Sequence, residues 1–174
     1  MKTIKTLLSA SIISLSLASV SAAAHTMHSA DNAQLAQAIA SEHRSAANKM
    51  RDEYRHPKQT LEFFGFKSNM TVVEITPGGG WYTEILAPAL KGKGKLIGAH
   101  YPDTGEDNYY SNSRKRLEKK LASDAIFSEV SLSDFVPRQK SELAPANTAD
   151  MVLTFRNLHN WREEGVAQVF VDAH

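Results

Sequence analysis

The sequence predicts an α/β protein built on a parallel central sheet. Short apolar runs, rich in β-branched residues, alternate with segments of helical periodicity, which is typical of strand–helix units. Crossovers of this kind are right-handed and place successive strands parallel. The predicted strands are Met70–Ile75, Lys95–His100, Ala125–Leu132 and Asp150–Phe155. Polar or glycine residues follow each of them, at the edge where open parallel sheets bind ligands.

A glycine turn between the first strand and its helix is the most distinctive feature. Gly78, Gly79 and Gly80 are adjacent and account for three of the nine glycines. Glycine permits a positive φ and close approach of a ligand, and the helix from Trp81 to Leu90 presents free N–H groups. The turn predicts a cradle for a polar or anionic small molecule, or else a tight turn without a ligand. No lysine follows the glycines, so the turn is not a P-loop, and its spacing differs from a dinucleotide fingerprint.

The first 24 residues are predicted to be a signal peptide. Lys2 and Lys5 precede an apolar stretch, Leu7–Val20, and small residues suited to cleavage follow it. The stretch is short for a membrane span, and an uncleaved anchor is the alternative. Removing residues 1–24 from the 174 leaves 150, enough for one domain. We therefore expect a periplasmic protein without stable membrane insertion.

Charge and cysteine content exclude several classes of function. The chain has 20 basic and 19 acidic residues, and without Lys2 and Lys5 the balance is 18 to 19. This balance does not favour a nucleic-acid partner. The absence of cysteine excludes disulfides, thiolate zinc sites and a cysteine nucleophile. His43, His56 and His174 lack partners at ligand spacing, so no metal site is predicted.

Residues 25–66 are predicted to form N-terminal helices. One helix begins at Asp31 and ends at His56, because Pro57 disfavours the helical conformation before it. Its apolar stripe comprises Leu35, Ile39, Ala46 and Met50, and its basic stripe comprises Arg44, Arg51 and Arg55. The basic stripe predicts a solvated face, or alternatively a wall that presents arginines to an anionic substrate. A second helix, Pro57–Phe64, is expected to stop at Gly65.

The remaining segments complete the predicted order. They are a polar loop at 102–112, a helix Ser113–Ala122, an irregular connection at 136–149, a loop at 156–161 and a last helix. The last helix is expected to turn Val166, Val169 and Phe170 inward.

Two motifs carry a resemblance to a known family. Glu74–Thr83 and Leu153–Trp161 resemble the class I S-adenosylmethionine-dependent methyltransferases, in particular an exported bacterial group described as predicted methyltransferases. The resemblance covers Arg51 to the end and implies a Rossmann-like methyltransferase fold at residues 67–174. It implies S-adenosyl-L-methionine as cofactor and methylation of a small-molecule acceptor.

The resemblance also implies roles for particular residues. Glu74 would orient the methionyl part of the cofactor, which would pass over Thr76, Pro77 and the three glycines, with Thr76 in place of the family's first loop glycine. His100 stands where the family has an acid for the ribose, and Asp103 lies nearby. The remaining contacts implied are Asp134 to the adenine amino group, Phe135 beside the ring, and Asn157 near the cofactor amino group and methyl. A base is needed only if the acceptor has to lose a proton, and His159 is the best placed candidate, with a structural role in the loop beside Trp161 as the alternative. Tyr109, Tyr110, Tyr82 and Trp81 are candidate walls of an acceptor pocket, with helix–sheet packing as the alternative for Tyr82 and Trp81.

Domains of this family continue beyond the fourth strand, so we expect the fold to lack its last strands. That leaves the fourth strand as an edge, and a domain that is marginally stable or dependent on a homodimer. Two other functions stay open. One is a non-catalytic periplasmic small-ligand-binding protein, because S-adenosylmethionine is made in the cytoplasm, and the other is an inactive truncated product.

Overall fold

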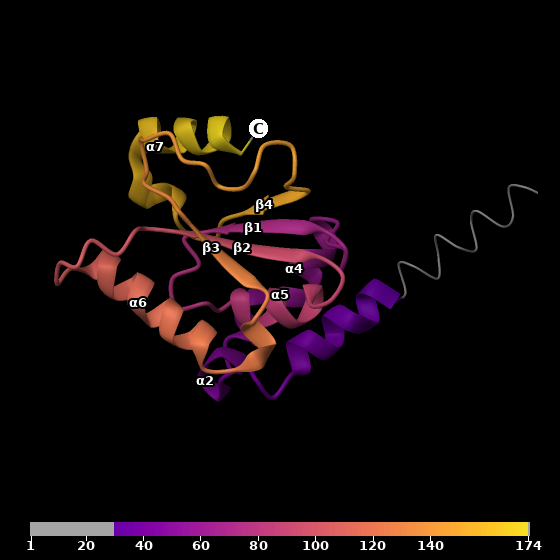
Figure 1. Cartoon of the computed structure of the whole chain (residues 1–174). Coiled ribbons are helices and arrows are strands. Elements are labelled where there is room, and N and C mark those ends of the chain that lie inside the picture. The colour runs from indigo at the N-terminus through magenta and orange to yellow at the C-terminus, as the bar shows by residue number, and fades with distance from the viewer. Residues whose placement is uncertain (1–29, 174) are drawn as a thin grey trace, which may run out of the picture.

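The protein has three layers, with a parallel sheet between two layers of helices (Figure 1). The computed structural model describes residues 30–173, so the predicted signal peptide lies outside the described part. Within that part, no helix is both long enough and apolar enough to cross a membrane.

The sheet contains β1 (Thr71–Ile75), β2 (Lys95–His100), β3 (Val130–Asp134) and β4 (Met151–Leu153). Its order is β3-β2-β1-β4 with every pair parallel, which confirms the predicted α/β class. After β1 the chain runs through α5 (Thr83–Leu90), β2 and α6 (Tyr109–Ala122) to β3, and then returns to the other side of β1. The strand order therefore reverses between β1 and β4, and such a switch point opens a crevice at the carboxyl ends.

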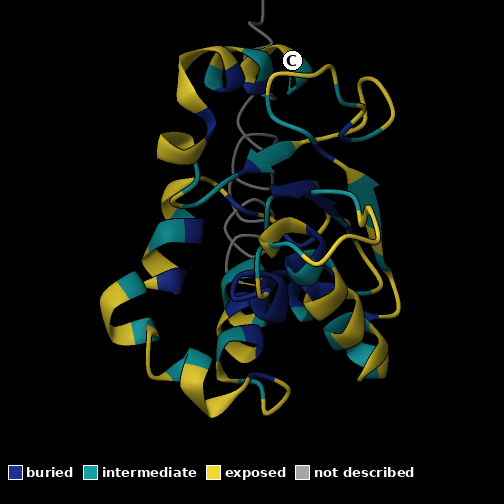
Figure 2. Cartoon of the chain, turned by 90° about the vertical axis from the view of Figure 1, so that its left-hand side faces the viewer, coloured by how far each residue is buried: buried dark blue, intermediate teal, exposed yellow. Residues whose placement is uncertain are grey.

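Each face of the sheet has its own apolar core. Val72, Leu96 and Leu153 belong to the cluster that also contains the buried residues of α5 and the N-terminal helices. Val73 and Ile75 pack on the opposite face with residues of α7 (Leu158–Asp172), among them Trp161 and Val169. The buried residues gather on the central strands and α5, while the outer helical faces are exposed (Figure 2). β1 is therefore buried on both faces, as its nearly continuous apolar sequence requires.

The prediction of one long N-terminal helix is wrong. The structure has a helix at 30–40, then α2 (Ala46–Lys49) and α3 (Asp52–Arg55). Arg44 breaks the periodicity, because its buried guanidinium donates to the Ile39 carbonyl at 2.8 Å and to both carboxylate oxygens of Asp52. Ala46 and Met50 are exposed in consequence.

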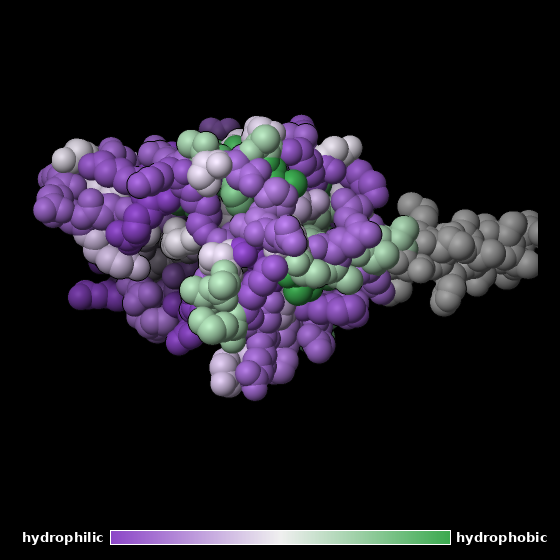
Figure 3. Space-filling view, turned by 90° about the horizontal axis from the view of Figure 1, so that it is seen from below, coloured by the Kyte–Doolittle hydropathy of each residue, from purple (hydrophilic) through white to green (hydrophobic). Residues whose placement is uncertain are grey.

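The face of the molecule seen from below is mainly hydrophilic with scattered apolar patches (Figure 3).

The predicted break at His56 is confirmed. His56 has a φ of 45° and separates α3 from α4 (Pro57–Phe63), which begins at the proline. Gly65 follows α4 with a φ of 74°. The Phe66 amide closes the turn by donating to the Leu61 carbonyl at 3.0 Å, as a glycine stop signal predicts.

The third strand begins later than predicted. Ala125–Phe127 form a 3₁₀ turn instead of a strand, since the Asp124 carboxylate accepts a hydrogen bond from the Ile126 amide at 2.9 Å. Asp134, expected in the following loop, ends β3 in register with His100.

The last helix differs from the prediction in two ways. It begins at Leu158, within the expected loop, and is interrupted at Arg162, whose φ is 59° and ψ is 178°. Val169 is buried as predicted, whereas Phe170 is 66% exposed.

Two glycines allow a test of how closely the chain packs at the start of β2. A Cβ on Gly94, just before β2, would lie 2.4 Å from the Met70 carbonyl oxygen, whereas one on Gly79 meets nothing within 4 Å. We expect Gly94→Ala to lower the free energy of unfolding by about 1–3 kcal/mol through overpacking. Gly79→Ala, which fits its backbone, should be neutral or slightly stabilising. Urea unfolding of both variants measures this, and equal stabilities would contradict it.

Candidate functional site

The turn after β1 is built from left-handed backbone positions. Thr76, Gly78 and Gly80 have φ values of 49°, 60° and 77°. The Gly80 amide donates to the Pro77 carbonyl at 3.0 Å and closes the turn before α5. A Cβ on Gly80 would lie 3.1 Å from Lys120 Cδ and 3.2 Å from Leu117 Cδ1, so α6 packs directly on this glycine. Gly80 therefore has both a conformational and a packing reason to be glycine.

A cavity of about 460 Å³ opens at the switch point beside this turn. Residues from β1, the glycine turn, the end of β4 and the short N-terminal helices line it. They are Asn48, Arg51, Arg55, Glu74, Ile75, Thr76, Pro77, Gly78, Gly79, Trp81, Tyr82, Tyr109, Phe155, Arg156 and Asn157. We call it the β1–β4 cavity, and its size is within the range of small-molecule sites.

Glu74 is the buried acid of the β1–β4 cavity. It is 3% exposed, and its carboxylate accepts a hydrogen bond of 2.7 Å from Thr83 Oγ1 at the start of α5. Burial raises the pKa of Glu74 to about 7, although the bond from Thr83 opposes the shift. A carboxyl held in this way can accept hydrogen bonds from a cationic or hydroxyl-bearing ligand.

Two further polar groups lie beside Glu74. The Oγ1 atom of Thr76 is buried and has no hydrogen-bond partner within the described residues. The Asn157 amide donates to Thr154 Oγ1 at 3.0 Å and to the Ile75 and Thr76 carbonyls at 3.4 Å. Asn157 therefore holds the end of β4 against the turn, while Thr76 has hydrogen-bonding capacity left for a ligand.

Arginines form the side of the cavity that faces the N-terminal helices. Arg51 and Arg55 line it from α3 and its preceding residue, and Arg156 lines it from the end of β4. The Arg55 guanidinium lies 4.7 Å from the centre of the Trp81 ring. Partial burial, with the charges of Arg51 and Arg156, lowers the pKa of Arg55. Of the predicted basic stripe, Arg51 and Arg55 line the cavity, Arg51 being exposed as well, whereas Arg44 is buried against Asp52.

Aromatic side chains close the floor of the cavity. Tyr82 stacks on Phe155 with ring centres 3.8 Å apart, which joins α5 to the end of β4. Trp81 Nε1 donates to the Asn48 carbonyl at 2.9 Å and ties α2 to the turn. Trp81 and Tyr82 are thus core residues whose rings also border the cavity.

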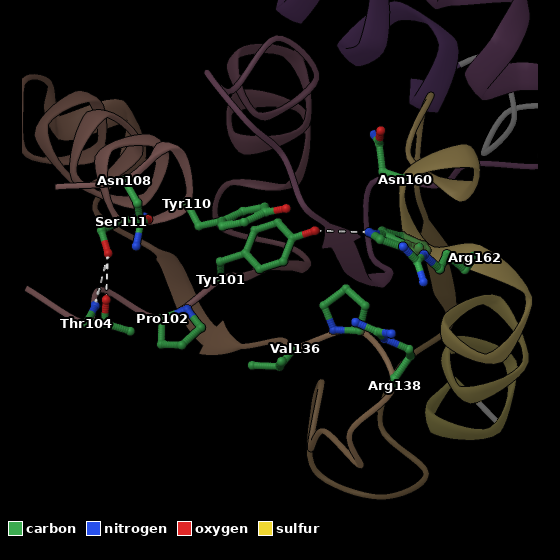
Figure 4. Close-up of a pocket in the computed structure, with 12 residues that line it drawn as sticks. Tyr101, Pro102, Thr104, Asn108, Tyr110, Ser111, Val136, Arg138, Asn160 and Arg162 are labelled. Carbon is green, nitrogen blue, oxygen red and sulfur yellow. Dashed lines mark hydrogen bonds between the residues drawn. The ribbon is translucent and has the colours of Figure 1, made fainter. Parts of the chain in front are cut away.

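A second cavity, of about 310 Å³, lies beyond the ends of β2 and β3 (Figure 4). Trp161 Nε1 donates to the Tyr101 hydroxyl at 3.1 Å, and Tyr101 and Tyr110 have ring centres 4.4 Å apart. Thr104 and Ser111 hydrogen-bond across its other end at 3.0 Å. We call this the β2–β3 cavity. With the β1–β4 cavity it gives the sheet ligand-sized space at all four strand ends.

The structure brings together some of the predicted site residues and not others. Glu74, Thr76, Pro77, Gly78, Gly79 and Asn157 line the β1–β4 cavity, while Gly80, the next residue of the turn, faces α6.

Besides Gly80, four predicted residues line neither cavity. His100 is buried and points to α6, with Nε2 3.3 Å from Ser113 Oγ, and burial lowers its pKa. Asp134 is exposed and pairs with Arg114 at 3.1 Å. Phe135 is fully buried against Trp161 in the core. His159 is exposed on α7 rather than in a loop. Among the described residues, no group of three or more His, Asp or Glu is placed to hold a metal ion.

Comparison with solved structures identifies the fold. No family model matches the chain, and no curated protein does. A SAM-dependent methyltransferase from Aquifex aeolicus is similar with a TM-score of 0.54 and 20% identity, over 68% of this chain and 58% of that one. The fold is that of the methyltransferases. A cyclopropane-fatty-acyl-phospholipid synthase-like protein from Lactobacillus casei is similar with a TM-score of 0.50 and 18% identity, over 81% of this chain and 53% of that one.

The chain thus spans little more than half the length of these two proteins. At such identities the likeness establishes the methyltransferase fold, while activity has to be inferred from the site. The sequence motifs singled out Glu74, the glycine turn and Asn157, which line or adjoin the β1–β4 cavity, but gave no ligand-binding role to Tyr101 or Trp161, which line the β2–β3 cavity.

The raised pKa of Glu74 predicts a dependence of stability on pH. Because the folded carboxyl binds its proton more tightly than the unfolded one, stability falls as pH rises from about 4.5 to about 7. Glu74→Gln removes this contribution, of about 3 kcal/mol across the interval. Urea unfolding at several pH values should therefore show the variant gaining on the wild type toward pH 8. Parallel profiles would contradict the assignment.

Proposed function

We propose that the protein is an S-adenosylmethionine-dependent methyltransferase that acts on a small molecule. The observation that carries this is the placement of Glu74, the glycine turn and Asn157 around one cavity at the switch point of a methyltransferase fold. Ligands of open α/β sheets bind at such a point.

The residues present fit the cofactor. Thr76 offers a buried hydroxyl that has no partner among residues 30–173, and the Glu74 carboxylate has an oxygen besides the one bound to Thr83. No atom lies within 4 Å of the Cβ positions of Gly78 and Gly79, so a ligand can lie close to this backbone. Glu74 would hold the cofactor's amino group, and the β2–β3 cavity, with its aromatic side chains, would hold its adenine.

The protein's part in such a reaction is mainly positioning. S-adenosylmethionine supplies an activated methyl group on its sulfonium. Glu74, fixed by Thr83, and the turn, fixed by Asn157, would hold the donor, and the walls of the β1–β4 cavity would align the acceptor with it. Tyr109 lines this cavity, whereas His159 does not, so a tyrosine is the better placed group for proton transfer.

A non-catalytic ligand-binding protein is the second candidate. The exposed position of His159 on α7 favours it, because the predicted base is absent from the cavity. The predicted signal peptide also favours it, since export separates the protein from cytoplasmic S-adenosylmethionine. Under either function we propose a periplasmic location.

Calorimetric titration with S-adenosylhomocysteine tests the proposal. We expect binding, and we expect Glu74→Gln to weaken it about tenfold or more, because a charge-assisted hydrogen bond is lost. Glu163→Gln, an exposed change on α7, is the matched control and should bind as the wild type does. A folded protein that binds neither S-adenosylmethionine nor its demethylated product would reject the methyltransferase proposal.

A further inference from the structure

We infer that the β1–β4 cavity takes an anionic acceptor, a small molecule with a phosphate or more than one carboxylate, held by Arg51, Arg55 and Arg156. This inference rests on the proposed function and names the substrate class for its site. It begins from the three guanidinium groups that line one cavity from two separate parts of the chain.

The three arginines have no carboxylate of their own. Within residues 30–173, none of them takes part in an ion pair or donates a side-chain hydrogen bond to a protein group. The nearby Asp52 is engaged by Arg44, which donates to both of its oxygens at 2.5 and 2.7 Å. Their donors are therefore available to a ligand, and planar guanidinium groups bind carboxylate and phosphate in a bidentate way.

Their placement is held by the fold. Arg55 lies over the Trp81 ring, and Trp81 is itself fixed by its bond to the Asn48 carbonyl. Arg156 has a φ of 62°, an uncommon conformation for a residue with a side chain, at the point where β4 leaves the sheet. The charges of Arg51 and Arg156 both lower the pKa of Arg55, so each of them lies close enough to Arg55 to repel it. Like charges gathered around one cavity favour a ligand of opposite charge.

The cofactor alone does not balance this charge. S-adenosylmethionine carries a sulfonium, an ammonium and a single carboxylate, which gives it a net positive charge. Glu74, whose pKa is about 7, is only partly ionised near neutral pH. A cationic donor beside three arginines therefore calls for a second, anionic ligand in the same cavity.

The test uses the full chain saturated with S-adenosylhomocysteine. Inorganic phosphate and succinate are titrated at constant ionic strength, with succinamide as the uncharged match for succinate. We expect both anions to bind and succinamide not to bind. Arg55→Gln, Arg51→Gln and Arg156→Gln should each weaken succinate binding about tenfold or more, as expected for a lost charge-assisted bond. Arg116→Gln, exposed on α6, makes the same change of charge away from the cavity and should leave affinity within about twofold.

Three results would overturn the inference. The first is no binding of either anion, and the second is equal weakening by Arg116→Gln and the cavity variants. The third is that the cavity variants weaken S-adenosylhomocysteine but not 5′-methylthioadenosine, which lacks the carboxylate, while succinate fails to bind. In that case the arginines serve the cofactor's own carboxylate. Failure of the proposed function looks different: S-adenosylhomocysteine does not bind, while succinate still binds and Arg55→Gln still weakens it, which supports the anion site alone.

Discussion

The structure depends on the sharp turn between β1 and α5. β1 is buried on both faces, and α5 covers one of them. The chain therefore has to reverse direction sharply between the end of β1 and the start of α5. The reversal uses a positive φ at Thr76, Gly78 and Gly80. Within residues 30–173, the Thr76 hydroxyl at this turn is buried without a hydrogen-bond partner, and the Glu74 carboxylate is bonded to Thr83 at the start of α5. The turn thus combines left-handed backbone positions with polar groups that have hydrogen-bonding capacity left, as is common at ligand sites.

The wall formed by α2 and α3 is held in place by side-chain interactions. α2 and α3 are four residues each, too short to be stable by themselves. Their position comes from the buried pair between Arg44 and Asp52, and from the bond between Trp81 and the Asn48 carbonyl. A buried charge costs free energy unless it is paired, and Arg44 meets this cost with a two-oxygen contact to Asp52. The positions of Arg51 and Arg55 in the cavity wall thus depend on Arg44, which does not line the cavity itself.

The sequence predicted the sheet well and the site in part. β1, α5 and β2 follow from strong local patterns, and the turn is visible in the sequence because glycine stands at two of its three left-handed positions, Gly78 and Gly80. The break of the first helix was missed because Arg44 looks like a surface residue until its partner Asp52 is known. His100 was misplaced for a similar reason. Its position at the end of β2 suggested a ligand contact, but its ring is directed by packing against α6. Such choices are tertiary, and local propensity does not encode them.

The contact of α6 with Gly80 connects the glycine turn to both cavities. α6 rests on the glycine through Leu117 and Lys120, and its first turn supplies Tyr109 to the β1–β4 cavity and Tyr110 to the β2–β3 cavity. The two cavities therefore share a wall, the first turn of one helix. A side chain at Gly80 would press on Leu117 and Lys120, and any shift of α6 that relieved this contact would move residues that line both cavities.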